Sequence, residues 1–304
     1  MSMSLHDAYV AETFGVDPTS YALPPAGAPE YADAEEHEDA EDQPAHAAEH
    51  GAAEADTDTD KAVADAADKA KKLDDEKLQK LSAADKAKML KALQAGGKPT
   101  GEAREQQRRI LRNMQLDPKF KQLEDKRGDD IAKSLKGDKE LEDARKNWGT
   151  LSADDKVKAL KKVVAAQSKG YGMTPPEIEQ YDKDPYTAPD GSTHIENGNF
   201  DPDDGKLHLN THAGSKMSNF NRALDLVLHE NGHNYQAKLI KDLKDGKIKE
   251  GDPEYTEATI FAANDGEEGY VQPDEEYNTY VKQPKENHSR TIGAETSKKI
   301  LDAL

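Results

Sequence analysis

The first 60 residues carry 16 Asp and Glu residues and no Lys or Arg. From Glu30 to Asp60 the chain is an Ala/Glu/Asp tract with almost nothing to bury, which is the composition of segments that do not fold by themselves. Only 34% of the whole chain is hydrophobic, and its mean hydropathy is −1.00. We therefore expect residues 1–60 to form a disordered acidic tail, and the core to be built from the residues that follow.

Residues 61–170 contain an internal near-repeat, in which LSAADKAKMLKALQ recurs as LSADDKVKALKKVV. Each copy opens with a capping box, Ser82 with Asp85 and Ser152 with Asp155, and therefore marks the start of a helix. Apolar residues follow at helical spacing in both copies. The pattern predicts a small bundle of four or five helices in this region.

Charge and composition exclude several classes of partner. Residues 61–170 hold 28 basic and 19 acidic residues, but the interleaved acids and scarce aromatics favour an ordinary solvated surface over nucleic-acid binding. No apolar run approaches the roughly 18 to 20 residues of a membrane span. The N-terminus lacks a basic segment followed by an apolar one, so we expect a protein made in the cytoplasm without a Sec signal. There is no cysteine, so any metal must be held by His, Asp or Glu.

The second half of the chain is more acidic and has a different pattern. Residues 171–192 are punctuated by four prolines and are expected to be a linker. A second domain is expected over residues 193–304. It begins with His194–Asn210, whose turn-rich centre, with Pro202 and Gly205, predicts a β-hairpin. The whole chain is thus expected to be an α+β protein, mainly helical, with a short sheet and an active-site helix in its C-terminal domain.

The sequence LDLVLHENGHNYQAKLI holds two histidines at helical spacing. His229 and His233 are four residues apart, so their imidazoles lie on one helical face and can bind one metal ion. Glu230 is offset by about 100° around the helix, which keeps it off the metal but beside a bound water. Asn231, Gly232 and Asn234 are poor helix formers in the middle of this helix. Such a conflict between propensity and pattern is expected at functional sites.

A catalytic zinc has three protein ligands and one open position, so a third ligand is needed. Pro284 suits the first turn of a helix, and this places Glu286 in that turn on a rigid element. Glu286 is therefore the first candidate. Glu257 lies on another predicted helix and is its rival, and His288 and His212 are weaker alternatives.

At these residues the sequence resembles a known family. The strand KLHLN, the helix HENGHNYQ and the later YVKQPKENHS are similar to zincin metallopeptidases of bacterial toxin and effector domains, in which HExxHxxQ is followed by Y-x-x-x-P-x-E-x-x-A. The resemblance covers about residues 193–296. It implies a zinc ion (Zn2+) bound by His229, His233 and Glu286, with Glu230 as the general base. Two positions depart from the pattern: Asn234 stands where an apolar residue is usual, and Ser289 stands in place of the small Ala.

The expected chemistry is hydrolysis of a peptide bond by a zinc-bound water that Glu230 deprotonates. Tyr280 and Tyr277, near the third ligand, are the candidates for a second donor to the oxyanion. The edge of the strand KLHLN is expected to pair with an extended protein or peptide substrate.

Three functions are compatible with this pattern. The first is a zinc metallopeptidase of the effector or toxin type, carried by an injection system or a virion through its N-terminal region. The second is a structural or interaction protein of a phage or secretion particle, in which zinc is only a staple; such a site would use four protein ligands. The third is a metal-dependent peptidoglycan amidase, although the ligand spacing is not the usual one. Glu230, which has no structural role in a staple, favours the peptidase.

Overall fold

The computed structural model of the chain describes residues 57–187, 193–273 and 275–304. The predicted acidic tail lies outside these residues, except for its last four, which begin α2 (Thr57–Lys71), the first helix of the described residues. Among the described residues no helix is both long and apolar enough to cross a membrane.

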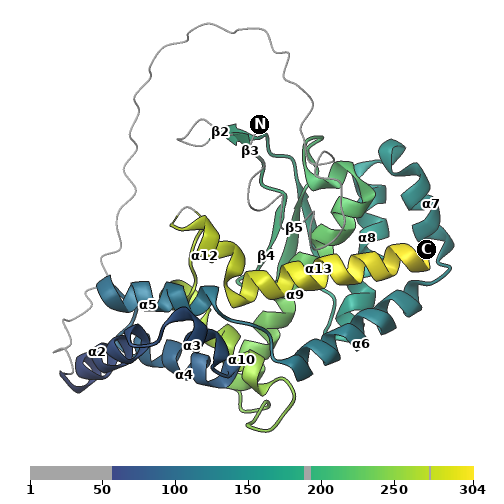
Figure 1. The fold of residues 1–304 in the computed structure, drawn as a ribbon. Helices are drawn as coiled ribbons and strands as arrows, with labels where there is room; N and C mark the ends of the chain where they lie inside the picture. Colours follow the sequence, from purple (N-terminus) through teal and green to yellow (C-terminus); the bar gives the residue numbers. More distant parts are fainter. Residues whose placement is uncertain (1–56, 188–192, 274) are drawn as a thin grey trace, which may run out of the picture. The chain divides into compact units, whose positions relative to one another are not determined.

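The region of the near-repeat is helical throughout, as predicted (Figure 1). Both predicted capping boxes begin helices: Ser82 and Ser152 each accept a hydrogen bond from the backbone N–H of the aspartate three residues later. The described residues of this region form seven α-helices rather than four or five, because short helices capped by Asp74 and Asp138 separate the longer ones. They are α2, α3 (Asp75–Lys80), α4 (Ala83–Leu93), α5 (Gly101–Arg112), α6 (Pro118–Leu135), α7 (Lys139–Asn147) and α8 (Ala153–Gly170), with a 3-10 helix, η2 (Trp148–Thr150), before the last.

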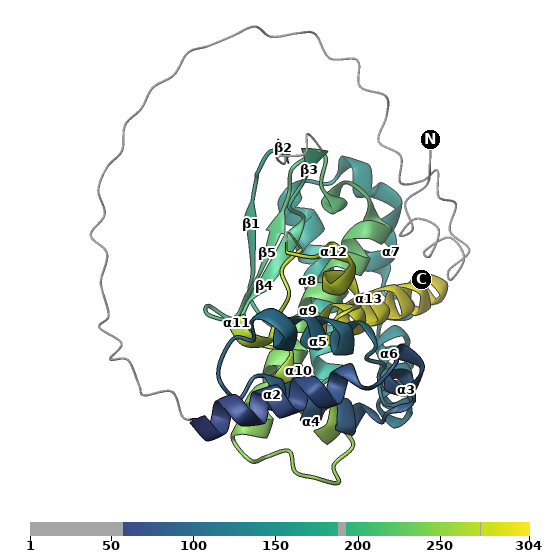
Figure 2. The ribbon, with the colours of Figure 1, turned by 60° about the vertical axis from the view of Figure 1, so that its left-hand side comes forward.

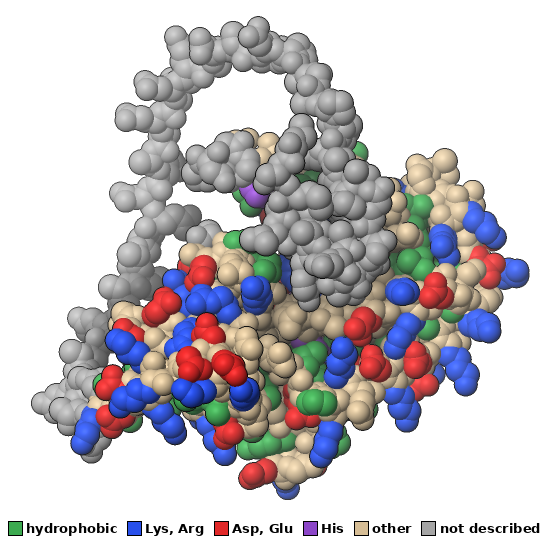
Figure 3. All heavy atoms as spheres, in the orientation of Figure 1, with side chains coloured by type: hydrophobic (Ala, Val, Ile, Leu, Met, Phe, Trp, Pro, Cys, Tyr) green, Lys and Arg blue, Asp and Glu red, His purple; other side chains and the backbone are tan. Residues whose placement is uncertain are grey.

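Acidic and basic side chains alternate over these helices. On the face seen in Figure 3, red and blue side chains are interspersed rather than separated into a basic and an acidic patch.

A three-stranded sheet follows, in the order β1 (Ile178–Tyr181), β5 (Lys206–Asn210), β4 (Gly198–Asp201). The predicted hairpin is present, because β4 and β5 are antiparallel neighbours and Gly205 adopts a positive φ of 72° in the turn between them. Two features differ from expectation. β5 is the central strand, since β1 pairs with it in parallel on its other side, and β1 itself lies within the predicted linker. A separate two-stranded ladder joins β2 (Tyr186–Thr187) and β3 (Thr193–His194).

The remaining described residues are mainly helical. They form η3 (Lys216–Ser218), the long helix α9 (Phe220–Lys244), α10 (Tyr255–Ala263), α11 (Gly266–Gly269), α12 (Tyr277–Lys282) and α13 (Pro284–Ala303). α13 crosses α9 near its middle, and the sheet and the helices α2–α5 lie toward opposite ends of α9 (Figures 1 and 2).

Two hydrophobic cores hold these elements together, and α9 contributes to both. The first half of α9, with Leu224 and Val227, packs with α6–α8 and with Leu207 and Leu209 of the sheet. Its second half, with Tyr235, packs with α2–α5 and α10. The regions expected to be a helical region and a separate C-terminal domain thus share both cores, and the described residues belong to one compact, mainly helical α+β unit.

Candidate metal centre

The helix α9 presents His229, Glu230 and His233 from its middle. Its buried stripe, which includes Leu224, Val227 and Leu228, is fully inaccessible to solvent. Asn219 begins the helix, and its side chain accepts a hydrogen bond from the backbone N–H of Arg222. The helix is therefore fixed by packing on both sides of the two histidines, and their side chains start from a rigid backbone.

The three poor helix formers of this segment each meet a neighbouring group. The Asn231 amide donates to Gln167 Oε1 at 2.9 Å and to Ser168 Oγ at 3.2 Å, both on α8. Asn234 in turn donates to Asn231 Oδ1 at 3.1 Å.

Gly232 faces α13, where a Cβ atom would lie 3.0 Å from Ser289 Oγ and 3.5 Å from Ser289 Cα. These residues are unfavourable in a helix, and a glycine costs about 1 kcal/mol relative to alanine. Their tertiary contacts compensate for this cost. The predicted conflict is resolved by the packing around the site.

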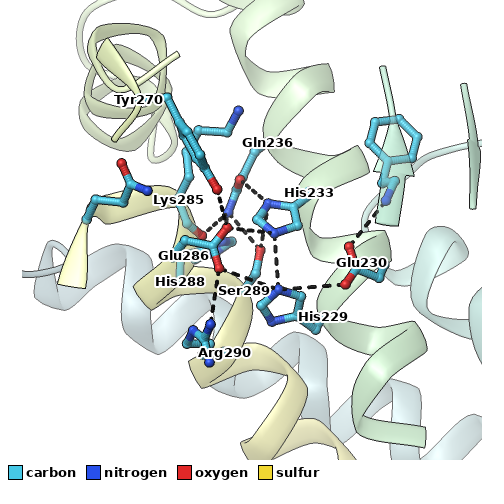
Figure 4. Close-up of polar contacts among 12 residues, drawn as sticks. His229, Glu230, His233, Gln236, Tyr270, Lys285, Glu286, His288, Ser289 and Arg290 are labelled. Atoms are coloured by element: carbon cyan, nitrogen blue, oxygen red, sulfur yellow. Dashed lines mark hydrogen bonds and ion pairs between the residues drawn. The ribbon is translucent and has the colours of Figure 1, made fainter. Parts of the chain in front are cut away.

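The first turn of α13 brings Glu286 to the two histidines. Pro284 occupies the start of the helix, as predicted, and Glu286 is 2% exposed. Glu286 Oε1 lies 3.3 Å from His233 Nε2, and Glu286 Oε2 lies 3.7 Å from His229 Nε2 (Figure 4). The two histidine Nε2 atoms are 3.1 Å apart. A second glycine, Gly293, permits this close crossing, since a Cβ atom there would lie 2.9 Å from Asp225 Oδ1 and 3.4 Å from His229 Cβ.

These three side chains fit a zinc ion. Ligand atoms at 2.0–2.2 Å in a tetrahedron are about 3.3 Å from one another. The two histidine nitrogens are 3.1 Å apart, and a Glu286 oxygen lies near each of them, Oε1 at 3.3 Å from His233 and Oε2 at 3.7 Å from His229. Glu286 Oε2 is buried without a hydrogen-bond partner among the described residues, and its one cationic neighbour there, the guanidinium of Arg290 at 3.6 Å, is beyond hydrogen-bond distance, so this oxygen is open to a metal ion. No fourth His, Asp or Glu of the described residues joins this group. These three side chains could therefore hold a metal ion and would leave one position of a tetrahedron open.

Glu230 lies beside these three ligand atoms without joining them. Its Oε1 is 3.9 Å from His229 Nε2, and its Oε2 accepts a hydrogen bond from the backbone N–H of Phe200, on β4, at 3.2 Å. Burial raises the pKa of Glu230 to about 7. The side chain can thus accept a proton near neutral pH, as a general base must.

The electrostatics of the three ligand side chains are coupled. Burial, followed by the neighbouring His233, lowers the pKa of His229 well below its usual value, so this imidazole is neutral. Burial alone would raise the pKa of Glu286, but hydrogen bonding and charge interaction with His233 hold it well below its usual range. The same contact raises the pKa of His233 despite its burial. Glu286 is therefore an anion, and positive charge is favoured beside it.

The other three candidates for the third ligand lie elsewhere. Glu257 is fully buried, and its Oε1 accepts the backbone N–H of Asp117 at 2.6 Å in the second core. His288 points away from the two histidines, with Nδ1 2.9 Å from Gln236 Nε2. His212 follows β5, where its Nε2 is 3.3 Å from Asp184 Oδ1.

The tyrosines form a small aromatic group around Glu286. Tyr270 donates its hydroxyl to Glu286 Oε1 at 2.6 Å, and nothing in its local sequence had indicated this role. Tyr280 is partly buried, 6.2 Å from the Tyr270 ring, and burial followed by the charge of Glu286 raises its pKa. Tyr277 is 53% exposed, and its ring lies 6.1 Å from that of Tyr280.

Arg290 is a further site residue that the sequence analysis missed. Its guanidinium lies 3.6 Å from Glu286 Oε2 and 5.7 Å from the centre of the Tyr280 ring. Its position four residues after Glu286, on the same face of a helix, was the signal that could have revealed it.

A second group of possible ligands lies on the outer face of the sheet. It comprises Glu179, Asp204 and His208. Lys206 forms an ion pair with Glu179, and its backbone N–H donates to Asp204 at 2.8 Å. His208 Nε2 lies 3.0 Å from the other Asp204 oxygen. The carboxylates of this group thus already have ion-pair or hydrogen-bond partners within the protein.

Comparison of the chain with models of protein families, with curated proteins and with solved structures gave no match. Assignment of a function therefore rests on the chemistry of the site itself.

Proposed function

We propose that the protein is a zinc-dependent peptidase that hydrolyses peptide bonds in a protein or peptide substrate. The observation that carries the proposal is the group formed by His229, His233 and Glu286, with Glu230 beside it. Two imidazole nitrogens and the Glu286 carboxylate offer ligand atoms that all lie within 4.8 Å of one another, while the carboxylate of Glu230 stays outside this group. A bound zinc would lower the pKa of a water molecule and polarise the substrate carbonyl.

The residues of the chain account for the movement of the proton. The backbone N–H of Phe200 holds Oε2 of Glu230, which leaves Oε1 on the side of His229. There Glu230 accepts a proton from the attacking water and then delivers it to the amine leaving group. A pKa near 7 suits both steps, because the group must bind and release the same proton.

Tyr280 and Arg290 are the proposed donors to the oxyanion that forms at the carbonyl. The Tyr270 hydroxyl is committed to Glu286 and therefore orients a ligand. Tyr280 also interacts with Glu286 but is partly exposed, and Arg290 brings a positive charge beside its ring. A preorganised donor at this place stabilises the charge that develops on the carbonyl oxygen.

Substrate pairing is proposed for β4 rather than β5. The expectation that the strand KLHLN offers a free edge is wrong, because β5 is paired on both sides. β4 is the edge strand next to the site, and its Phe200 N–H already faces Glu230. An extended peptide added to β4 would lie alongside the proposed zinc ligands.

A purely structural zinc is less well supported. A closed staple uses four protein ligands, and the described residues supply three. Glu230 would also be a buried carboxylate with no structural purpose beyond one hydrogen bond. We also propose that the protein is a toxin or effector delivered by an injection system or a virion. Its N-terminal region would serve this delivery.

The test is Glu230→Gln, which keeps the shape of the side chain and removes the base. The variant is expected to bind one zinc per chain and to lose peptidase activity by at least a thousandfold. Activity is sought on unfolded casein and on quenched fluorescent peptide libraries, with a chelator to confirm dependence on metal.

Glu257→Gln is the matched control, because Glu257 is also buried and burial also raises its pKa to about 7. This variant should retain the wild-type turnover. A Glu230→Gln protein as active as the wild type on a verified substrate would exclude the mechanism.

A further inference from the structure

Gln236, three residues after His233, is a completely buried amide between α9 and α13. Its Oε1 lies 3.0 Å from His233 Nδ1. Its Nε2 lies 2.8 Å from the backbone oxygen of Lys285, 2.9 Å from His288 Nδ1 and 3.0 Å from Ser289 Oγ. Figure 4 shows this amide between the ring of His233 and the first turn of α13.

The backbone carbonyl of Lys285 fixes which way the amide points. A carbonyl oxygen only accepts hydrogen bonds, so the group that faces it must be the NH2 of Gln236. The amide oxygen therefore faces His233. Because this oxygen also only accepts, its contact with His233 is a hydrogen bond only when His233 carries a proton on Nδ1, and Ser289 Oγ, 3.3 Å from the same nitrogen, can then accept as well.

That proton decides which nitrogen is available to a metal. A neutral imidazole protonated on Nδ1 has its lone pair on Nε2. Nε2 is the nitrogen that lies 3.3 Å from Glu286 and 3.1 Å from His229 Nε2. The hydrogen bonds of Gln236 thus exclude the tautomer that is protonated on Nε2 alone, so that loss of the Nε2 proton leaves a lone pair that points into the ligand group.

We propose that Gln236 is a positioning residue that sets the tautomer and the ring orientation of His233 for metal binding. The inference rests on the proposed function, since it concerns the same zinc. Lys285 directly precedes Glu286, so the one amide also ties the His233 ligand on α9 to the Glu286 ligand on α13. Outer hydrogen-bond partners of this kind raise metal affinity by about 10- to 100-fold.

The contacts continue from Gln236 into the helical region. One N–H of the Gln236 amide donates to Lys285 O, and the other faces His288 Nδ1 and Ser289 Oγ. His288 Nε2 lies 3.7 Å from Glu124 Oε2 on α6. Glu124 is held in turn by the hydroxyl of Tyr171 at 2.7 Å and by Arg127 at 2.8 Å. Helix α6 therefore supports the side of Gln236 that faces away from the metal ligands.

The experiment compares Gln236→Met with Gln167→Met in the full chain. Both glutamines are completely buried and both contact α9, but Gln167 bonds to Leu228 O and Asn231 and not to a ligand. Zinc affinity is measured by competition with a chromophoric chelator, and the site is probed by the visible spectrum of bound Co2+. Gln236→Met is expected to weaken zinc binding by about 10- to 100-fold and to change the Co2+ spectrum. Gln167→Met should lower the melting temperature and leave zinc affinity within about threefold.

A second measurement uses the wild-type protein and does not depend on the folding of a variant. In the 15N-labelled, zinc-loaded chain, NMR should place the proton of the His233 ring on Nδ1. A proton on Nε2 would overturn the inference, as would wild-type zinc affinity in Gln236→Met or an equal loss in both variants. Failure of the wild-type chain to bind zinc would instead overturn the proposed function, and the inference with it.

Discussion

Glu286 and Glu257 are two buried carboxylates in different regions of the same molecule, and their surroundings lead to opposite chemistry. They are 2% and 0% exposed, and each has an Oε2 without a hydrogen-bond partner among the described residues. Two histidines and a tyrosine hydroxyl surround Glu286, and its pKa is lowered. Glu257 has one backbone N–H as its partner, and burial raises its pKa to about 7.

The difference shows that burial alone does not identify a metal ligand. A carboxylate removed from water either takes up a proton or attracts positive charge. Around Glu257 no cationic side chain comes within ion-pair distance in the described part of the chain. Protonation of its carboxyl group is therefore favoured. Around Glu286 the nitrogens of two histidines point at one place, where a divalent ion satisfies the anion and both lone pairs.

Substitutions of Glu286 and Glu257 are expected to differ most in their effect on zinc affinity. Glu286→Gln should weaken zinc affinity by about a thousandfold, because one ligand of three contributes roughly 3–4 kcal/mol of the binding free energy. Glu257→Gln should leave the affinity within about threefold. Both are measured by competition with a chelator of known affinity. The reverse result, with zinc lost from Glu257→Gln alone, would transfer the third ligand to Glu257.

The second effect is on stability, and it depends on pH. The folded-state pKa of Glu257 lies above its ordinary value of 4.5, so the fold binds the proton more tightly than the unfolded chain does. This contribution is fully present below pH 4.5 and is lost as the pH rises through about 7. A shift of this size corresponds to about 3 kcal/mol.

Glu257→Gln is neutral at all pH values and can still accept the Asp117 N–H. It should therefore gain up to about 3 kcal/mol in free energy of unfolding over the wild type at pH 8, and little at pH 4.5. Urea denaturation at the two pH values measures the difference. An equal effect of the substitution at both would contradict the assignment of a protonated Glu257.

The smallest effect is expected at the second group of possible ligands, on the sheet. His208→Ala should leave one zinc bound per chain with unchanged affinity, because the carboxylates of this group already interact with Lys206, Glu179 through its ammonium and Asp204 through its backbone N–H. His229→Ala is the paired variant and should abolish binding. Metal analysis of the two dialysed proteins makes the comparison. A second equivalent of zinc in the wild type that disappears in His208→Ala would give the sheet a metal site of its own.

Local features of the site could be predicted from the sequence. The spacing of His229 and His233 and the capping residues Ser82 and Ser152 act within one or two turns of helix, so a short window contains the whole signal. Pro284 likewise placed Glu286 in the first turn of α13. The antiparallel pair of β4 and β5 was predictable because its turn is short.

Features that depend on contacts distant in sequence were not predictable. Whether β5 is an edge or a central strand depends on β1, which the many prolines around it had marked as linker. The part played by α6 and α8 behind the site depends on buried side chains such as Glu124 and Gln167, whose partners lie far along the chain. Tyr270 reaches Glu286 from a segment without any regular pattern.

The crossing of α9 and α13 also determines when the site can form. Gln236 on α9 and His288 on α13 are 52 residues apart in sequence. During synthesis, His229 and His233 therefore leave the ribosome well before α13 has been made. Until α13 packs on α9, the histidines have no carboxylate beside them. For the proposed peptidase, this order keeps the nascent chain inactive while neighbouring unfolded segments are still exposed to cleavage. If the protein is delivered unfolded, as an effector of the proposed kind, the same delay would apply on arrival, since its peptidase activity would then begin only with refolding.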